Sequence, residues 1–81
     1  MPVRLTLVSR AYCHLCHEMA SDVQAIADEY ECDIEVADVD VDPELLRLYD
    51  ERVPVLLHQG EVLSQYFLDI AKVRDYLSKI R

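Results

Sequence analysis

The chain has 81 residues, 52% of them hydrophobic, with a single Gly and three Pro. This size and composition predict one folded domain over residues 1–81 and exclude a disordered chain. The formal net charge of -8 argues against nucleic acids and anionic membranes as partners, since both repel an acidic surface. No apolar run reaches the length of a membrane span and no signal peptide is apparent, so we expect a cytoplasmic protein.

The first half of the chain predicts a strand, a helix and a second strand. Apolar residues alternate with polar ones over residues 3–8, which is typical of a strand, and then recur at helical spacing from Leu15 to Tyr30. Residues 34–41 are rich in β-branched side chains and predict the second strand. The alternation slips near Ala37, so we expect either a bulge or an early end of the strand there.

The second half predicts a short helix, a hairpin and a last helix. Asp42 and Pro43 are typical of the N-cap and first position of a helix. Residues 53–57 and 61–64 predict two strands joined by a Gln-Gly turn. Asp69 is expected to cap the final helix. The apolar stripe of that helix consists of Ile70, Val73, Leu77 and Ile80.

The predicted elements follow one another as strand, helix, strand, helix, strand, strand, helix. The first three suit a right-handed parallel crossover, and the last two strands suit an antiparallel hairpin packed by the final helix. The predicted fold class is therefore α/β, with a four-stranded mixed sheet that three helices cover on both faces.

Two cysteines, Cys13 and Cys16, stand where the first strand passes into the first helix. Residues three apart share a face in the first turn of a helix, so the two sulfur atoms can meet. The free N–H groups and partial positive charge of a helix N-terminus stabilise a thiolate, which is the nucleophile of thiol–disulfide exchange. The chain has three cysteines, an odd number that argues against a secreted disulfide framework, and we expect Cys32 to be a bystander.

The element order, the stretch 9–16 around the cysteine pair and the sequence Val53-Pro54 resemble glutaredoxin and the thioredoxin fold. The acidic run over residues 38–45 is similar to the exit of the second strand in glutaredoxin-like proteins. The resemblance covers residues 3–80 and is closest to the short bacterial glutaredoxin-like proteins. It implies a thioredoxin-like fold of order βαβαββα and the activity of a thiol–disulfide oxidoreductase that reduces protein or glutathione mixed disulfides.

The resemblance also implies roles for individual residues. Cys13 matches the exposed nucleophile, and Cys16 matches the buried resolving cysteine. Pro54 matches the cis-proline that lies against the disulfide, and Val53 would offer its backbone N–H and C=O to an extended substrate. Arg10, three positions before the nucleophile, would favour the thiolate and pair with a substrate carboxylate.

Two departures from the glutaredoxin pattern bear on the substrate. His14 and Leu15 replace the usual Pro-Tyr between the cysteines, and His14 is expected either to act at the substrate site and tune the thiolate or to be a plain exposed residue. The family's Gly-Gly, which contacts glutathione, falls on Ser64 and Gln65. Both a protein disulfide and a small-molecule thiol such as glutathione therefore remain as partners.

We expect no bound cofactor, with glutathione as a candidate co-substrate, and we expect a monomer. One alternative is a thioredoxin-fold module that binds partners at the Val53-Pro54 edge without catalysis. The other is a metal or iron–sulfur site, because Cys and His are zinc donors and His14 and His17 adjoin the cysteines. Four ligands within five residues rarely close one tetrahedron, so we assign no metal ligands.

Overall fold

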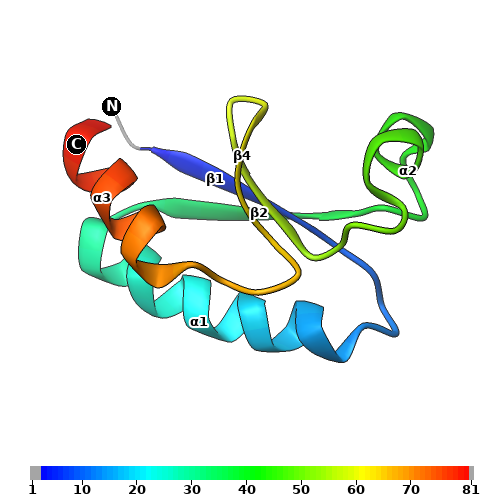
Figure 1. Cartoon of the computed structure of the whole chain (residues 1–81), viewed down its shortest axis with the longest axis horizontal. Coiled ribbons are helices and arrows are strands. Elements are labelled where there is room, and N and C mark those ends of the chain that lie inside the picture. Colours follow the sequence, from blue (N-terminus) through cyan, green and yellow to red (C-terminus); the bar gives the residue numbers. More distant parts are fainter. Residues whose placement is uncertain (1–2, 81) are drawn as a thin grey trace.

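A computed structural model describes residues 3–80, in which the predicted order of strands and helices is confirmed (Figure 1). The elements are β1 (Arg4–Ser9), α1 (His14–Tyr30), β2 (Asp33–Asp38), α2 (Pro43–Tyr49), β3 (Val55–His58), β4 (Glu61–Gln65) and α3 (Ile70–Ile80). Within the described range the strands form one sheet in the order β2-β1-β3-β4. β1 and β2 are parallel, whereas β3 is antiparallel to both of its neighbours. The predicted α/β class with a mixed sheet is therefore confirmed.

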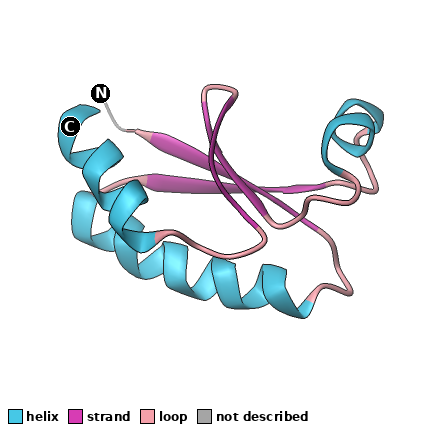
Figure 2. Cartoon of the chain, in the orientation of Figure 1, coloured by secondary structure: helices cyan, strands magenta, loops and turns pink. Residues whose placement is uncertain are grey.

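The helices divide between the two faces of the sheet (Figure 2). α1 and α3 lie together on one face, whereas α2 lies near one end of the sheet, on the side away from α1. The core under α1 and α3 consists of Leu5, Leu7, Met19, Val23, Ile26, Leu56, Leu63, Val73 and Leu77. The smaller core beside α2 consists of Val8, Val39, Tyr49, Val55 and Leu57. Neighbours such as Leu7 and Val8 belong to different cores because successive side chains of a strand point to opposite faces.

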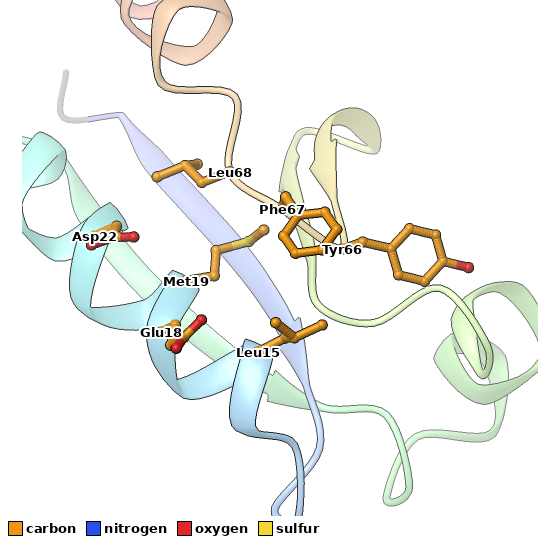
Figure 3. Close-up of a pocket in the computed structure, with 7 residues that line it drawn as sticks. All are labelled: Leu15, Glu18, Met19, Asp22, Tyr66, Phe67 and Leu68. Atoms are coloured by element: carbon orange, nitrogen blue, oxygen red, sulfur yellow. The ribbon is translucent and has the colours of Figure 1, made fainter.

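The segment that joins β4 to α3 lies beside α1, with which it lines a pocket (Figure 3). Met19 of α1 points toward this segment, where Phe67 and Leu68 lie (Figure 3). Its main chain is fixed at its start by the N–H of Tyr66, which donates to the C=O of Pro54 at 2.9 Å. The segment therefore links the beginning of β3 to the surface of α1.

β2 and β3 differ from their predicted bounds by more than one residue, whereas β1 and β4 differ by no more than a single residue at an end. β2 ends at Asp38, which is the early end that the slip in alternation allowed, because Asp40 donates its N–H to the Asp38 carboxylate at 2.9 Å and turns the chain. β3 begins at Val55, so the predicted start at Val53 is wrong. Pro54 has no N–H to contribute to a strand ladder, and its peptide bond to Val53 is cis.

The last helix buries less of its apolar stripe than predicted. Val73 and Leu77 are fully buried, whereas Ile70 and Ile80, at the two ends of α3, are 49% and 39% exposed. Only the middle of α3 therefore packs against the sheet and α1. Among residues 3–80, no helix combines the length and the apolar character needed to cross a bilayer.

Candidate active site

The predicted site residues come from segments that leave the sheet at the same end. β1 and β2 run in parallel and finish as partners at Ser9 and Asp38. β3 runs the other way and begins at that end, with Val55 opposite Val8. The loop that carries the cysteine pair, the turn after β2 and the segment before β3 are therefore neighbours at one end of the sheet.

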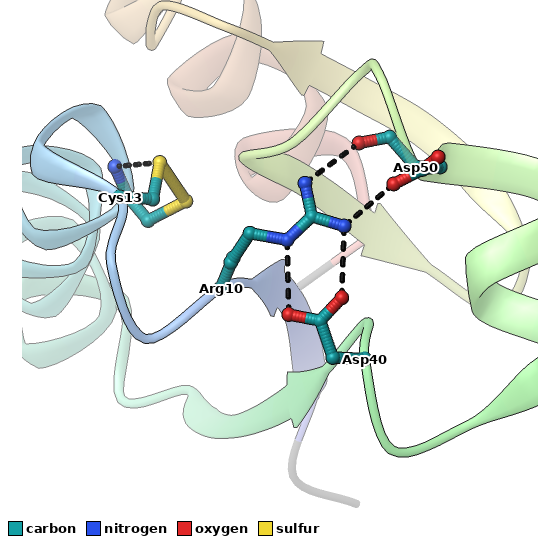
Figure 4. The surroundings of a disulfide bond; sticks show 5 residues. Arg10, Cys13, Asp40 and Asp50 are labelled. Atoms are coloured by element: carbon teal, nitrogen blue, oxygen red, sulfur yellow. Dashed lines mark hydrogen bonds and ion pairs between the residues drawn. A yellow bond between two sulfur atoms is a disulfide. The ribbon is translucent and has the colours of Figure 1, made fainter.

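Cys13 and Cys16 form a disulfide at the start of α1, with their Cα atoms 5.1 Å apart (Figure 4). Cys13 is the N-cap of α1, and its extended backbone points its Sγ back toward the first turn, where it accepts a hydrogen bond from the N–H of Cys16 at 3.0 Å. After reduction, the same N–H can donate to a thiolate at Cys13. The N–H of Cys16 is thus placed where the predicted thiolate would lie, and the stabilisation of that thiolate stays a prediction.

The two sulfur-bearing residues differ in exposure. Cys16 is 1% exposed, whereas Cys13 is partly exposed. An incoming disulfide can reach Cys13 from solvent, but it cannot reach Cys16 without opening the helix start. Cys32 lies just before β2, at the opposite end of the sheet. Cys32 is therefore too distant from Cys13 and Cys16 to take part in their thiol–disulfide exchange.

Arg10 turns away from the disulfide and joins three segments (Figure 4). Its Nε and Nη2 donate to the two carboxylate oxygens of Asp40 at 2.9 Å each. Its Nη2 also donates to the Asp50 carboxylate at 2.6 Å, and its Nη1 donates to the Asp50 C=O at 3.2 Å. Arg10 therefore ties the loop before α1 to the turn after β2 and to the end of α2. Its expected contacts with a thiolate and a substrate carboxylate stay predictions.

The bridge made by Arg10 shifts the ionisation of its partner. The hydrogen bond from the Arg10 guanidinium, aided by its charge, holds the pKa of Asp40 below the ordinary value of 3.8. A carboxyl group whose pKa is lowered by folding stabilises the fold above its ordinary pKa. That contribution is lost as the pH falls through the lower value of the folded state.

We expect Asp40→Asn to lower the free energy of unfolding at pH 7. As the pH falls below 3.8, the ordinary pKa of the Asp40 carboxyl, we expect the free energy of unfolding to decrease less steeply in this variant than in the wild type. Urea unfolding at pH 7 and at steps below pH 4 measures both effects. Glu35→Gln is the control, since Glu35 is an exposed acid on β2 that makes no ion pair within residues 3–80. Equal acid dependence in the two variants would contradict a stabilising role for the Arg10 bridge.

The segment before β3 presents an unoccupied backbone. Pro54 is buried and its C=O accepts the N–H of Tyr66. Within the described part of the chain, no hydrogen bond engages the main-chain N–H or C=O of Val53. These two groups are free to pair with an extended substrate, and that role stays a prediction, as does the role of Pro54 beside the disulfide.

His14 lies on the first turn of α1 and is 87% exposed in its side chain. Its Nε2 is 3.1 Å from a carboxylate oxygen of Glu18, one turn further along the helix. Among the described residues, the structure records no hydrogen bond or ion pair between His14 and either cysteine sulfur. The action of His14 at the substrate site stays a prediction. Between residues 3 and 80, no three His, Cys, Asp or Glu side chains gather in a group that could hold a metal ion.

A shallow pocket that the sequence analysis missed lies beside the disulfide loop (Figure 3). One wall is a single face of α1, and the other is the segment after β4. The residues that line it are Leu15, Glu18, Met19, Asp22, Tyr66, Phe67 and Leu68. The signal that could have revealed the second wall is the run of apolar residues 66–68 directly before the cap of the last helix.

A mixed sheet of this topology, with a cysteine pair at the N-terminus of α1 and a proline before β3, defines the class of thioredoxin-fold dithiol proteins. Residues 4–78 match the glutaredoxin-like domain (DUF836), and the chain belongs to this family. The expected kinship with short glutaredoxin-like proteins is thereby confirmed.

Solved structures agree with this assignment. Protein Ne2328 from Nitrosomonas europaea, solved by solution NMR, is 35% identical with a TM-score of 0.83, over 94% of this chain and 92% of that one. Thioredoxin 1 from Thermosipho africanus is 22% identical with a TM-score of 0.68, over 95% and 92%. Thioredoxin from Fasciola hepatica is 21% identical with a TM-score of 0.65, over 99% and 82%, and the two thioredoxins show the fold alone. A comparison with the curated proteins gives no match.

Proposed function

We propose that the protein is a thiol–disulfide oxidoreductase that reduces protein or glutathione mixed disulfides with Cys13 and Cys16. The observation that carries the proposal is the unequal placement of the two sulfurs. Cys13 is the partly exposed N-cap of α1 and accepts a hydrogen bond from a helix N–H, whereas Cys16 is buried within the first turn. This arrangement suits one cysteine for attack on a substrate and the other for release of the product.

The reaction passes two electrons from the cysteine pair to the substrate. The Cys13 thiolate attacks one sulfur of the substrate disulfide, forms a mixed disulfide and releases the other sulfur as a thiolate. Cys16 then loses its proton and attacks the Cys13 sulfur, which forms the Cys13–Cys16 disulfide and releases the second substrate sulfur. Both released thiolates take up protons. A second dithiol, or two glutathione molecules, reduces the pair again by the same exchange in reverse.

The remaining features of the proposal follow from this chemistry. No bound cofactor is required, because the electrons reside in the two thiols. The main chain of Val53 would pair with the substrate segment on either side of the reacting sulfur. We propose a monomer that works in the cytoplasm, since a reducing compartment keeps such a dithiol in its electron-donating form.

Redox titration tests the proposal. The protein is equilibrated in glutathione buffers of different potential, its free thiols are alkylated, and the products are counted by mass spectrometry. We expect Cys13 and Cys16 to oxidise together as a two-electron unit while Cys32 remains alkylated at every potential. In the reduced protein, we expect Cys13 to react with the alkylating agent at least about tenfold faster than Cys32 near neutral pH.

Two outcomes would contradict the proposal. One is oxidation of Cys13 and Cys16 at separate potentials, and the other is equal alkylation rates at Cys13 and Cys32. Either result would favour the competing function, which is a thioredoxin-fold module that binds partners without catalysis. Cys32→Ser serves as the control, because it removes the bystander thiol and should leave the titration of the pair unchanged.

A further inference from the structure

The pocket beside the disulfide begins at the residue between the two cysteines. Leu15 contributes to it, and the other lining residues of α1 follow at positions 18, 19 and 22. Residues at this spacing share one face of a helix, so the pocket extends along α1 for two turns, or about 10 Å. A substrate held at Cys13 would have its neighbouring residues over this surface. The same length corresponds to about three residues of extended chain.

The floor of the pocket is apolar and open to solvent. Met19 is buried beneath it, and Phe67, which forms the facing wall, is 72% exposed (Figure 3). Tyr12, which directly precedes the nucleophile in the chain, is 94% exposed. A large apolar side chain left in water beside an apolar pocket is typical of a surface that is covered when a partner binds. The partner therefore brings apolar side chains of its own.

The rim of the pocket is acidic. Glu18 and Asp22 lie on the part of α1 that borders the pocket, and none of the described residues that line it is basic. Within residues 3–80, Asp22 has no ion-pair partner, and the partner of Glu18 is His14, which carries a charge only when protonated. Neither carboxylate therefore pairs with a Lys or Arg among the described residues.

The cations at this end of the sheet do not offset that charge. Arg10 is held by the carboxylates of Asp40 and Asp50. Arg52 lies on the α2 side, where it donates to the side chain of Gln65 and stands over the ring of Tyr49. The chain as a whole carries a net charge of -8. An anionic substrate would meet repulsion both on approach and at the pocket, whereas a cationic one would be attracted.

We propose that the preferred substrate is a polypeptide disulfide whose reacting cysteine lies within about three residues of an apolar side chain and a Lys or Arg. The apolar side chain occupies the pocket against Phe67, and the basic side chain pairs with Glu18 or Asp22. Glutathione is a poor fit to this surface, because it has two carboxylates, one ammonium group and no large apolar side chain. This inference rests on the proposed oxidoreductase function and specifies its substrate class.

The test uses three disulfides and measures the rate of their reduction by the reduced protein. Two are peptides of equal length that differ only in carrying Leu and Lys, or Leu and Glu, beside a cysteine in disulfide linkage to the same aromatic thiol. The third is the glutathione disulfide of that thiol. We expect the Lys peptide to be reduced about tenfold faster than the Glu peptide and the glutathione disulfide at low salt. We expect the difference to shrink in about 1 M salt, where charges are screened within about 3 Å.

Variants connect the preference to the rim of the pocket. Glu18→Gln with Asp22→Asn should bring the rates for the Lys and Glu peptides to within about twofold of each other. Asp33→Asn with Glu35→Gln is the matched control, because it removes two exposed acids from β2 and changes the net charge equally. This control should keep the preference. Phe67→Ser should slow the Lys peptide more than a peptide in which Ala replaces Leu.

The outcomes separate this inference from the proposed function. If the wild-type protein reduces none of the three disulfides, the proposed function fails. If it reduces them without regard to charge, or if the glutathione disulfide reacts fastest, the substrate class is wrong and the oxidoreductase function stands. A preference that survives in the Glu18→Gln, Asp22→Asn variant, or that is lost equally in the Asp33→Asn, Glu35→Gln control, would overturn the role of the pocket rim.

Discussion

Cys16→Ser is expected to leave the protein covalently attached to its substrate, whereas Cys13→Ser is expected to attach to none. Cys13 is the sulfur that an incoming disulfide can reach, so the first exchange needs it alone. Cys16 is held one turn behind at a Cα separation of 5.1 Å, where it acts as an intramolecular thiol. Loss of that neighbour should slow release of the product by at least about a thousandfold, since an external thiol must take its place.

Electrophoresis without reductant and mass spectrometry of the intact adduct measure this difference after incubation with a peptide disulfide. Cys32→Ser is the control and should turn over as the wild type does. Adducts of equal yield in Cys13→Ser and Cys16→Ser would mean that either sulfur can attack. Unchanged turnover in Cys16→Ser would mean that the pair does not act as a unit. Each of these results would remove the distinction between nucleophile and resolving cysteine.

The order of elements could be predicted because its signals are local. The Asp42 carboxylate accepts the N–H groups of Glu44 and Leu45 at 2.9 and 3.3 Å, as expected of an N-cap two or three residues away. The hairpin turns at Gln59 and Gly60, whose φ angles of 50° and 85° are those of a two-residue turn. Such contacts depend on neighbours in sequence, so a single sequence is enough to locate them.

The position of the cysteine pair could also be predicted from the sequence, but the contacts of the residues around the pair could not. The resemblance to glutaredoxin predicts that Arg10, three residues before Cys13, acts at the disulfide. The structure pairs Arg10 with Asp40 and Asp50, which lie 30 and 40 residues further along the chain and which the sequence did not indicate. Asp40 belongs to the acidic run after β2, but the sequence did not indicate that this run contains a partner of Arg10. The carboxylate that pairs with an arginine is determined by how the loops pack at the end of the sheet. No local sequence pattern indicates that packing.

The pocket was missed for the same reason. Its two walls, α1 and the segment around Phe67, are joined only through the folded sheet. The helical spacing from Leu15 to Tyr30 predicts the apolar stripe of the first helix, but a stripe has the same pattern whether a sheet or a solvent-filled groove faces it. At Leu15 the stripe continues past the edge of the core, and that part of it is available to a substrate.

Leu7→Ala is expected to cause the largest loss of stability among these changes. Leu7 is fully buried in the middle of β1, where it pairs with Val36 of β2 and Leu56 of β3 and packs in the core under α1 and α3. Removal of a buried leucine side chain costs about 2–5 kcal/mol, because apolar contacts are lost and a cavity remains. A small domain has a free energy of unfolding of about 5–15 kcal/mol, so the variant should lose a large part of it.

Urea unfolding of the oxidised protein at pH 7 measures the loss, with Leu48→Ala as the matched control. Leu48 lies on α2 and is 40% exposed, so the same truncation there should cost less than about 1 kcal/mol. Equal costs would mean that the layer between the sheet and α1 is not the main source of stability. The comparison also bears on the site, because the cavity would open between β1 and α1, the helix that holds the cysteine pair. A loosened α1 would present the N–H of Cys16 to the Cys13 sulfur less firmly, so Leu7→Ala should also reduce the advantage of Cys13 over Cys32 in alkylation.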